Sequence, residues 1–156
     1  MRRRDREVTD KKQIEKFISE QEILRVGFYD EGDIYIVPVN YGYTLENDRY
    51  TFYFHGARAG RKYELAKACP TVGFEIDGDY RLIGGEEACD YTASFRSVIG
   101  SVTVSLVDSR DEKIMGLNAL MKQTAKRSNW TYDEQMFEAV AIFRLDADKI
   151  SCKAKL

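Results

Sequence analysis

The sequence predicts a mainly β protein: a closed or partly closed antiparallel barrel with two or three flanking helices. The first observation is a hydrophobic pattern of period two that recurs in several short segments bounded by turn residues. The second is a supply of ten Tyr, eight Phe and one Trp, residue types that favour strands. The third is a length of 156 residues with 44% hydrophobic side chains, enough for one core but short for two domains. We therefore expect a single domain over residues 1–156, with residues 1–9 as an N-terminal arm.

The charge balance and the lack of long apolar runs limit where the protein acts. Lys and Arg number 24 and Asp and Glu 26, a net charge of −2, whereas nucleic-acid binding normally needs a strongly basic face. No apolar run has membrane-spanning length, and the N-terminus leads into no apolar signal core. The cysteines Cys69, Cys89 and Cys152 form no CxxC pair, which is typical of a reducing compartment. We expect a cytoplasmic protein that binds neither membrane nor nucleic acid.

Missing motifs exclude several reaction classes. His55 is the only histidine, so the chain cannot build a histidine-rich zinc site or a bis-histidine haem, and we expect no metal site. The sequence has no G-x-S-x-G elbow and no GxxxxGK[ST] loop, which excludes the usual serine-hydrolase and P-loop chemistry. It also lacks a GxGxxG strand–turn–helix unit, so any nicotinamide reductant must dock transiently or act through a partner protein.

The N-terminal quarter predicts an arm and a short helix. The arm mixes arginines with acidic residues, which is typical of a solvated segment. Asp10 with Gln13 three residues later resembles a capping arrangement. Ile14, Phe17 and Ile18 then have the spacing of an amphipathic helix.

Three strands are expected next, over residues 23–29, 34–43 and 50–55. Turn residues separate them at 30–33 and 46–48. Because the connections are short, an antiparallel meander is the simplest arrangement.

The middle of the chain predicts a helix between further strands. A loop bounded by glycines, 56–60, leads into a helix over 61–68 that Pro70 stops. A strand over 71–77 then ends at a Gly78-Asp79 turn, and a long extended segment covers 92–107.

The C-terminal third contains the clearest helical signal. Ser109 with Glu112 forms a capping box. The apolar side of the helix that follows carries Ile114, Leu117, Leu120, Met121 and Thr124. Residues 129–137 read as irregular, 139–145 as a strand and 150–154 as an edge strand.

The segment 56–62 is the first candidate site. Arg61 and Lys62 lie in the first turn of the predicted helix, where each cation opposes the helix dipole by about 0.3–1 kcal/mol. An anion at that terminus would remove the conflict, and the small residues Gly56, Ala57 and Gly60 would let the backbone approach it closely. A solvent-exposed basic turn fits the same residues.

Two more segments suggest a ligand. Pro38 cannot donate a hydrogen bond within a sheet, so it indicates an edge, a bulge or an opening. An opening would free backbone groups and the Asn40 amide for a flat heteroaromatic ligand; otherwise Pro38 protects an edge strand from aggregation. Arg96 and Ser97 open a run that otherwise reads as core, which places them near a strand end. A structural ion pair of Arg96 is the alternative.

Taken in order, five segments resemble a known family. They are Met1-Arg2-Arg3 with Asp5-Arg6-Glu7, Ile36 to Gly42, Phe54 to Lys62, Ala88-Cys89-Asp90, and Arg96 to Gly100. Together they are similar to the nitroimidazole-resistance (Nim-type) flavoproteins of the pyridoxamine 5'-phosphate oxidase-like superfamily. The resemblance implies an FMN-binding split barrel, antiparallel and Greek-key-like, that forms a homodimer with FMN in grooves at the subunit interface. Tyr91, Ala59 and Val102 depart from the usual pattern, and none of them is one of the cations expected at the phosphate.

The resemblance also implies which residues hold the cofactor. Arg61 and Lys62 would bind the FMN phosphate, with the backbone of Gly56, Ala57 and Gly60 as its cradle. The remaining implied cofactor residues are Val37, Pro38, Val39, Asn40 and Tyr41 along the isoalloxazine ring, and Arg96, Ser97 and Val98 from the long strand. His55 would lie close to the flavin.

The function implied by the resemblance is that of an FMN-dependent oxidoreductase. It would reduce nitroimidazole-like compounds or other small electron acceptors, with NAD(P)H or a redox protein as a transient reductant and His55 as proton donor. Two alternatives stay open: a flavin-binding carrier or sensor without turnover, and a split barrel that binds haem or no cofactor. The fold alone does not decide among these activities.

Overall fold

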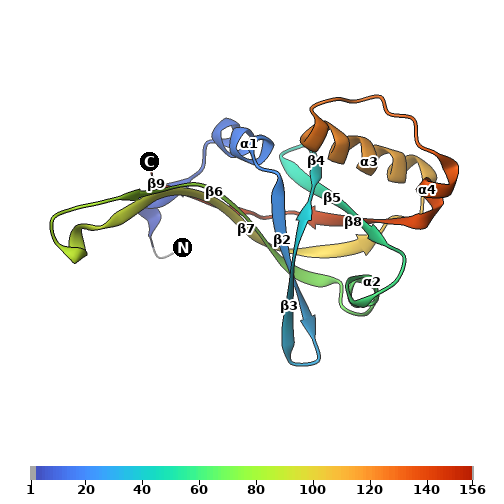
Figure 1. Ribbon diagram of the computed structural model, residues 1–156, viewed down its shortest axis with the longest axis horizontal. Helices are drawn as coiled ribbons and strands as arrows, with labels where there is room; N and C mark the ends of the chain where they lie inside the picture. The colour runs from blue at the N-terminus through green and yellow to red at the C-terminus, as the bar shows by residue number, and fades with distance from the viewer. Residues whose placement is uncertain (1–2, 156) are drawn as a thin grey trace.

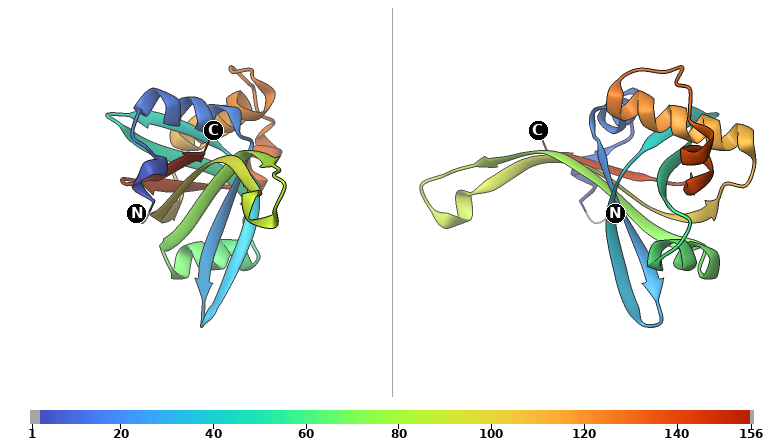
Figure 2. Two further views of the ribbon diagram at one scale, coloured as in Figure 1. Left: turned by 90° about the vertical axis from the view of Figure 1, so that its left-hand side faces the viewer. Right: turned by 45° about the vertical axis from the view of Figure 1, so that its right-hand side comes forward.

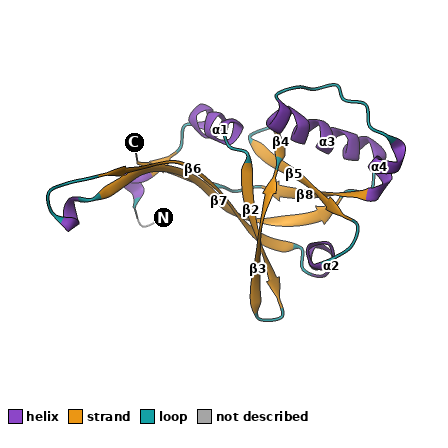
Figure 3. Cartoon of the chain, in the orientation of Figure 1, coloured by secondary structure: helices purple, strands orange, loops and turns teal. Residues whose placement is uncertain are grey.

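A nine-stranded antiparallel sheet forms most of the molecule, and helices cover parts of its surface (Figures 1 and 3). The computed structural model describes residues 3–155. In chain order the elements are the 3₁₀ helix η1 (Arg4–Arg6), β1 (Glu7–Val8), α1 (Lys11–Glu20), β2 (Ile23–Asp30), β3 (Asp33–Asn40), β4 (Gly42–Glu46), β5 (Arg49–Ala57), α2 (Arg61–Ala68), β6 (Thr71–Ile83), the 3₁₀ helix η2 (Ala88–Asp90), β7 (Thr92–Leu106), α3 (Arg110–Ala125), α4 (Glu134–Ala139), β8 (Val140–Ala147) and β9 (Ser151–Lys155). Within residues 3–155, no helix is both long and apolar enough to cross a membrane.

The strands follow the order β3-β2-β6-β7-β8-β5-β4, and β9 pairs with both β7 and β1. Side chains from the inner side of this sheet pack into one core. Its fully buried members include Leu24, Val26, Phe28, Phe52, Phe54, Ile76, Val98, Phe143 and Leu145. The prediction of a mainly β, antiparallel split barrel is confirmed.

The predicted meander is wrong. The expected strand over 34–43 is two strands: β3 ends at Asn40, β4 begins at Gly42, and they lie at opposite ends of the strand order. Tyr41 separates them, because its ring is fully buried and its hydroxyl donates a hydrogen bond to the Ile18 carbonyl at 2.6 Å. A Cβ at Gly42 would collide with the backbone of Ala119 and Leu120, so the start of β4 packs directly on α3. These long-range contacts end the extended run.

The predicted turn at Gly78-Asp79 is also wrong. β6 continues through it to Ile83 with a register shift between Gly78 and Arg81, and Asp79 adopts a φ of 57°. These features are typical of a bulge, which bends a strand without ending it. As a result β6 and β7 form a long hairpin that extends well beyond the barrel (Figures 1 and 2).

The N-terminal arm is more ordered than expected. Residues 4–6 form η1, and β1 pairs with β9 through Glu7 opposite Lys153 and Val8 opposite Cys152. The described part of the arm, residues 3–9, is exposed or half-buried, as expected of a solvated segment, but its pairing with β9 was not expected, and because of it β9 is not an edge strand. Met1 and Arg2 lie outside the described residues.

The predicted helix starts are confirmed. Asp10 accepts hydrogen bonds from the backbone N–H groups of Lys12 and Gln13 at 2.9 and 3.1 Å, and α2 has the expected bounds. Ser109 caps α3 by accepting from Glu112 N at 3.1 Å. In the stretch expected to be irregular, Asp133 caps the additional helix α4.

The predicted core side of α3 is largely wrong. Its buried residues are Lys113, Gly116, Leu120 and Gln123, of which only Leu120 was expected. The reason is a close approach at Gly116, where a Cβ would lie 2.9 Å from Tyr53 Cδ1 and 3.0 Å from Ile142 Cγ2. The helix therefore turns its small and polar side to the sheet.

Candidate functional site

Lys62 is a half-buried cation at the start of α2. Its Nζ lies 5.5 Å from the ring centroid of Phe54 and 5.4 Å from that of Phe143, and these two rings stack at 4.6 Å. Within residues 3–155 the ion pairs of α2 involve Arg61 and Lys67, and none includes Lys62. Burial lowers the pKa of Lys62, because desolvation disfavours its charged form. An anion beside Nζ would compensate this charge.

The backbone around Lys62 leaves room for such an anion. Gly60 precedes α2 with a φ of 97°, and no side chain caps the helix. A Cβ at Gly56 would come within 3.0 Å of the Lys62 Nζ. Because the first N–H groups of a helix lack partners inside it, this terminus offers donors next to the cation.

Arg61 has a different environment from its neighbour Lys62. Its Nε donates to Asp30 Oδ2 at 2.6 Å, and its guanidinium carbon lies 4.5 Å from the centre of the Tyr35 ring. The sequence places two cations, Arg61 and Lys62, at the positive end of the α2 dipole. Asp30 compensates the charge of Arg61, whereas no acidic side chain within residues 3–155 compensates that of Lys62.

His55 lies on β5 next to Gly56 and is exposed. In the sheet register it is opposite Ile142 of β8. The protein around the ring partly desolvates it, and this desolvation, followed by the positive charge of Lys62, lowers the pKa of His55. The neutral imidazole is thus favoured near neutral pH.

The expected ring-lining segment forms the end of edge strand β3. Pro38 is exposed and lies opposite Arg25 of β2, which confirms an edge position. Asn40 is exposed, and its amide donates to the Glu22 carbonyl at 3.2 Å. Val37 is half-buried, whereas Val39 and Tyr41 belong to the core. The side chains of this segment that reach the surface are thus those of Val37, Pro38 and Asn40.

Arg96, Ser97 and Val98 lie in the middle of β7, and the expectation of a strand end is wrong. Arg96 forms ion pairs with Asp79 and, at 3.0 Å, with Glu20. Val98 is fully buried in the core. Arg96 lines a cavity of about 200 Å³ with Phe17 and Cys152, and neither Arg61 nor Lys62 borders it. One chain therefore does not bring Arg96 together with the basic start of α2.

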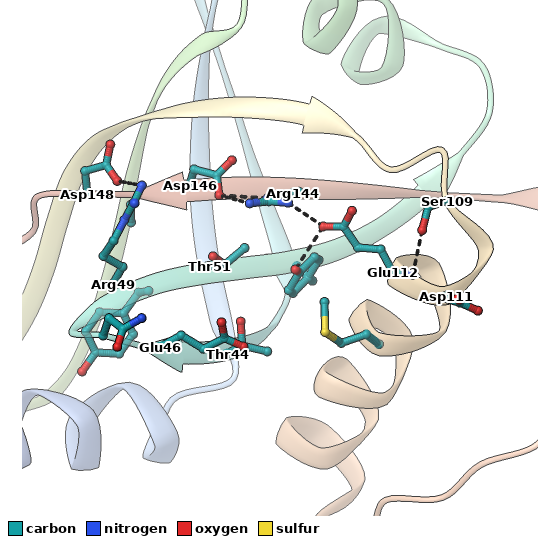
Figure 4. Close-up of a pocket in the computed structure, with 15 residues that line it drawn as sticks. Thr44, Glu46, Arg49, Thr51, Ser109, Asp111, Glu112, Arg144, Asp146 and Asp148 are labelled. Atoms are coloured by element: carbon teal, nitrogen blue, oxygen red, sulfur yellow. Dashed lines mark hydrogen bonds and ion pairs between the residues drawn. The ribbon is translucent and has the colours of Figure 1, made fainter.

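Sequence reasoning missed a polar pocket of about 570 Å³ between the β4–β5 hairpin, the end of β8 and the start of α3 (Figure 4). Glu112, the expected capping-box carboxylate, accepts from Tyr53 Oη at 3.3 Å and from Arg144 at 2.7 Å. The local sequence signal for this group of polar contacts was the pair Arg144 and Asp146. These opposite charges are two residues apart on β8 and therefore point to the same side of the strand. Within residues 3–155 no group of His, Cys, Asp and Glu side chains could hold a metal ion.

Comparisons with known proteins agree with this fold. The family model described as pyridoxamine 5'-phosphate oxidase matches residues 10–154. A solved structure of a candidate 5-nitroimidazole antibiotic resistance protein from Bacteroides thetaiotaomicron is 27% identical, covers 95% of this chain and 86% of its own, and superimposes with a TM-score of 0.80. No curated protein sequence matches the chain.

Two further structures share the fold at lower identity. The flavocytochrome Anf3 from Azotobacter vinelandii is 19% identical over 100% of this chain and 72% of its own, with a TM-score of 0.81. An FAD and heme binding protein from Mycobacterium smegmatis is 14% identical over 96% of this chain and 73% of its own, with a TM-score of 0.80.

Proposed function

The chain belongs to the pyridoxamine 5'-phosphate oxidase family, and we propose that it is an FMN-dependent oxidoreductase that reduces small electron acceptors such as nitroimidazole-like compounds. The observation that carries the proposal is Lys62, a half-buried cation without an acidic partner in residues 3–155, beside an uncapped helix terminus. The similarity to a candidate 5-nitroimidazole resistance protein over 95% of the chain supports the choice of acceptor.

The residues at this position fit a phosphate group. Lys62 supplies a cation, Gly60 leaves the α2 N–H groups uncapped, and Gly56 keeps open the space in front of Nζ. A phosphate monoester is a dianion, so it gains both from Lys62 and from the helix terminus. Arg61, held by Asp30, borders the same site and contributes its remaining N–H groups.

We propose that a second copy of the chain completes the site. The best-defined pockets within residues 3–155 of one chain are lined by neither His55 nor Lys62, which supports a site that one chain leaves incomplete. The outer side of β2, β3 and β7 exposes large apolar side chains: Tyr29 at 55%, Ile34 at 65%, Ile36 at 62% and Ile99 at 47%. An apolar surface of this kind is typical of an interface. A homodimer would cover it and supply the second wall of the flavin site.

In the proposed reaction the flavin supplies the electron transfer, and the protein positions it and the acceptor. Lys62 would hold the phosphate end of the cofactor. The neutral imidazole of His55 can donate its N–H to an acceptor oxygen, and the imidazolium, formed by taking up a proton from solvent, can deliver that proton as the acceptor is reduced. Electrons enter from NAD(P)H or from a redox protein that docks transiently.

The haem alternative is favoured by one specific observation. Two proteins of the same fold are described as a flavocytochrome and as an FAD and heme binding protein. The absorption spectrum of freshly purified protein tests it, because flavin and haem absorb differently in the visible range.

Activity is tested by anaerobic mixing of the flavin-loaded protein with NADH or NADPH and then with a nitroimidazole. We expect bleaching of the flavin absorption by the reductant and its recovery on addition of the acceptor. A flavin that binds but is not reoxidised by any nitro compound would leave the carrier or sensor alternative in place. A protein that takes up no flavin in any form would refute the cofactor proposal itself.

A further inference from the structure

The distal part of the β6–β7 hairpin, residues 79–92, projects from the barrel as a two-stranded arm, here called the β6–β7 arm (Figures 1 and 2). The alternation of buried and exposed side chains along β6 stops at Ile76, and none of residues 77–91 is buried. The most exposed large apolar side chains of the arm, at 71%, 57% and 53%, are Tyr80, Leu82 and Tyr91. Because a two-stranded hairpin is only marginally stable by itself in water, these side chains indicate a surface that becomes covered.

The bulge at the base of the arm determines which way its side chains point. Gly78 lies opposite Arg96, whereas Arg81 lies opposite Ser94, so β6 has one residue more than β7 in this interval. Side chains alternate along a strand, and one extra residue therefore moves every later position of β6 to the other face. The bulge thus turns Leu82 to the face opposite to the one that a regular strand would give it.

The face that carries Leu82 continues along β7 to the outer side of the barrel. Leu82 is paired with Ala93. Ala93 lies an even number of positions from the exposed Ile99, so the two side chains point to the same side of β7. A Cβ at Gly84, two residues after Leu82, would lie 3.4 Å from Tyr91 Cε1, which places the Tyr91 ring on this face as well.

The opposite end of the same outer face belongs to the β2–β3 hairpin, where the exposed apolar side chains are Tyr29, Ile34 and Ile36. In the sheet register Ile36 is opposite Gly27, Gly27 is opposite Gly73, and Gly73 is opposite Ser101 of β7. The outer face is therefore continuous from β3 to β7, with apolar side chains at both ends and small residues between them.

The accessible area of the chain supports a large contact with a partner. The chain exposes 9842 Å², whereas a compact monomer of 18.0 kDa typically exposes about 8,000 Å². The excess, about 1,800 Å², is larger than the roughly 800 Å² that each partner buries in an interface of standard size. A face with apolar groups at both ends can be self-complementary under two-fold rotation, so a second copy of the chain fits it.

We propose that the β6–β7 arm of each chain lies on the β2–β3 end of the partner's outer face, with Leu82 against Ile36 of the partner subunit. One two-fold rotation places both arms in this way and covers both apolar ends. This inference rests on the homodimer of the proposed function, and it identifies the segments that hold the two copies together.

Sedimentation equilibrium of the purified full-length protein tests the proposal through the dissociation constant of the dimer. Leu82→Glu places a carboxylate in the apolar contact twice per dimer, so it should raise this constant by about 100-fold or more. Ile83→Glu is the matched control: Ile83 is the next residue of the same strand, is 40% exposed and points to the other face, so the constant should stay unchanged.

A double variant tests the contact between the arm and β3. Ile36→Lys should weaken the dimer as Leu82→Glu does. When both changes are combined, opposite charges meet across the interface, so the double variant should dimerise at least about tenfold more tightly than either single variant. Within one chain β3 and the arm project in different directions (Figure 1), so such a rescue reports a contact between two chains.

The possible outcomes separate this inference from the proposed function. A dimer that Leu82→Glu leaves unchanged, or a double variant no tighter than the single ones, would overturn the role of the arm and leave the proposed flavin function standing. An unsubstituted protein that stays monomeric at micromolar concentration would refute the homodimer and this inference with it, and would leave the arm to a different protein.

Discussion

Arg61 Nε donates to the Asp30 carboxylate at 2.6 Å, across 31 residues of chain and from the first turn of α2 to the end of β2. Its neighbour Lys62 has no such partner in residues 3–155 and faces two stacked aromatic rings instead. Two adjacent cations that look equivalent in the sequence are therefore unequal as anion-binding groups.

The first prediction follows from this inequality. Lys62→Met should weaken FMN binding by about tenfold or more, because it removes a charge-assisted hydrogen bond from a partly desolvated position. Arg61→Met should cost less, because Asp30 already engages that guanidinium. Riboflavin, which lacks the phosphate, should bind both variants as it binds the unsubstituted protein.

Flavin fluorescence titration measures these affinities, and Lys67→Met is the matched control on the same helix. Lys67 is paired with Glu64 and its side chain is 53% exposed. Equal losses for FMN and riboflavin in the Lys62 variant would show that the phosphate binds elsewhere.

The second prediction concerns assembly. Light scattering at micromolar concentration should give the mass of a dimer. Ile36→Lys should yield a monomer with poor flavin retention, because it places a charge in the proposed apolar interface. Met136→Lys, a change of the same kind at a 66% exposed position on α4, should leave the dimer intact. A stable monomer of the unsubstituted protein that still binds FMN would contradict the proposal.

The third prediction tests the close contact that ends the β3–β4 run. A methyl group at Gly42 would meet the backbone of α3, which cannot rotate away, so Gly42→Ala should cost about 3 kcal/mol or more of unfolding free energy. Gly116→Ala should cost about 1 kcal/mol, because the higher helix propensity of Ala offsets part of the contact with Tyr53. In Gly84→Ala the nearest atom is a Tyr91 side-chain carbon at 3.4 Å, an ordinary contact, so this variant is the control. Urea unfolding gives all three values.

Local signals account for the elements that the sequence predicts well. Capping side chains at Asp10 and Ser109 mark the starts of α1 and α3, and the β2–β3 and β4–β5 turns lie where their turn residues indicate. The prediction of a meander was wrong because Tyr41 ends β3 by burying its ring and donating a hydrogen bond to the Ile18 carbonyl. This contact joins residues far apart in the chain, so no local sequence pattern indicates it. The prediction of which side of α3 faces the core was wrong for a similar reason. Gly116 lets the helix approach Tyr53 and Ile142 closely, and hydrophobic periodicity gives no indication of such a contact.

In the candidate site, too, features with a local sequence signal were predictable and contacts between distant residues were not. The basic start of α2 was predictable, because the conflict between two cations and a helix dipole lies within a few residues. The Asp30 partner of Arg61 was not, and neither was the pocket where Glu112 meets Tyr53 and Arg144. These contacts join elements that are distant in the chain, and only the sheet topology brings them together.

The fourth prediction uses the only histidine of the chain as a reporter. NMR titration of ligand-free protein should give His55 a pKa below the usual value of about 6.5. Lys62→Met should raise this pKa, because it removes a positive charge that disfavours imidazolium. FMN should raise it as well, since its phosphate compensates Lys62, whereas riboflavin should raise it less.

The same shift has a defined effect on stability. When the folded pKa of a histidine is lowered, the unfolded chain takes up the proton first as pH falls. His55 therefore lowers the free energy of unfolding as pH drops from about 6.5 through its folded pKa, and it has no such effect at higher pH. His55→Gln should remove this component. A His55 pKa at or above the usual value would refute both statements.

The fifth prediction separates a catalytic from a structural role of His55. The ring is exposed and its strand neighbours Phe54 and Gly56 face the core side, so His55→Ala should fold normally and keep bound FMN. If the imidazole delivers a proton, acceptor reduction should slow by about 10²-fold, the lower end for general acid catalysis. The remaining rate should lose its pH dependence below about pH 6.5, because the group that titrates there is gone. Stopped-flow reoxidation of reduced flavin by a nitroimidazole across pH 5–8 measures both effects. Unchanged turnover with intact FMN would exclude His55 from the reaction, and loss of FMN together with lower thermal stability would assign it a structural role.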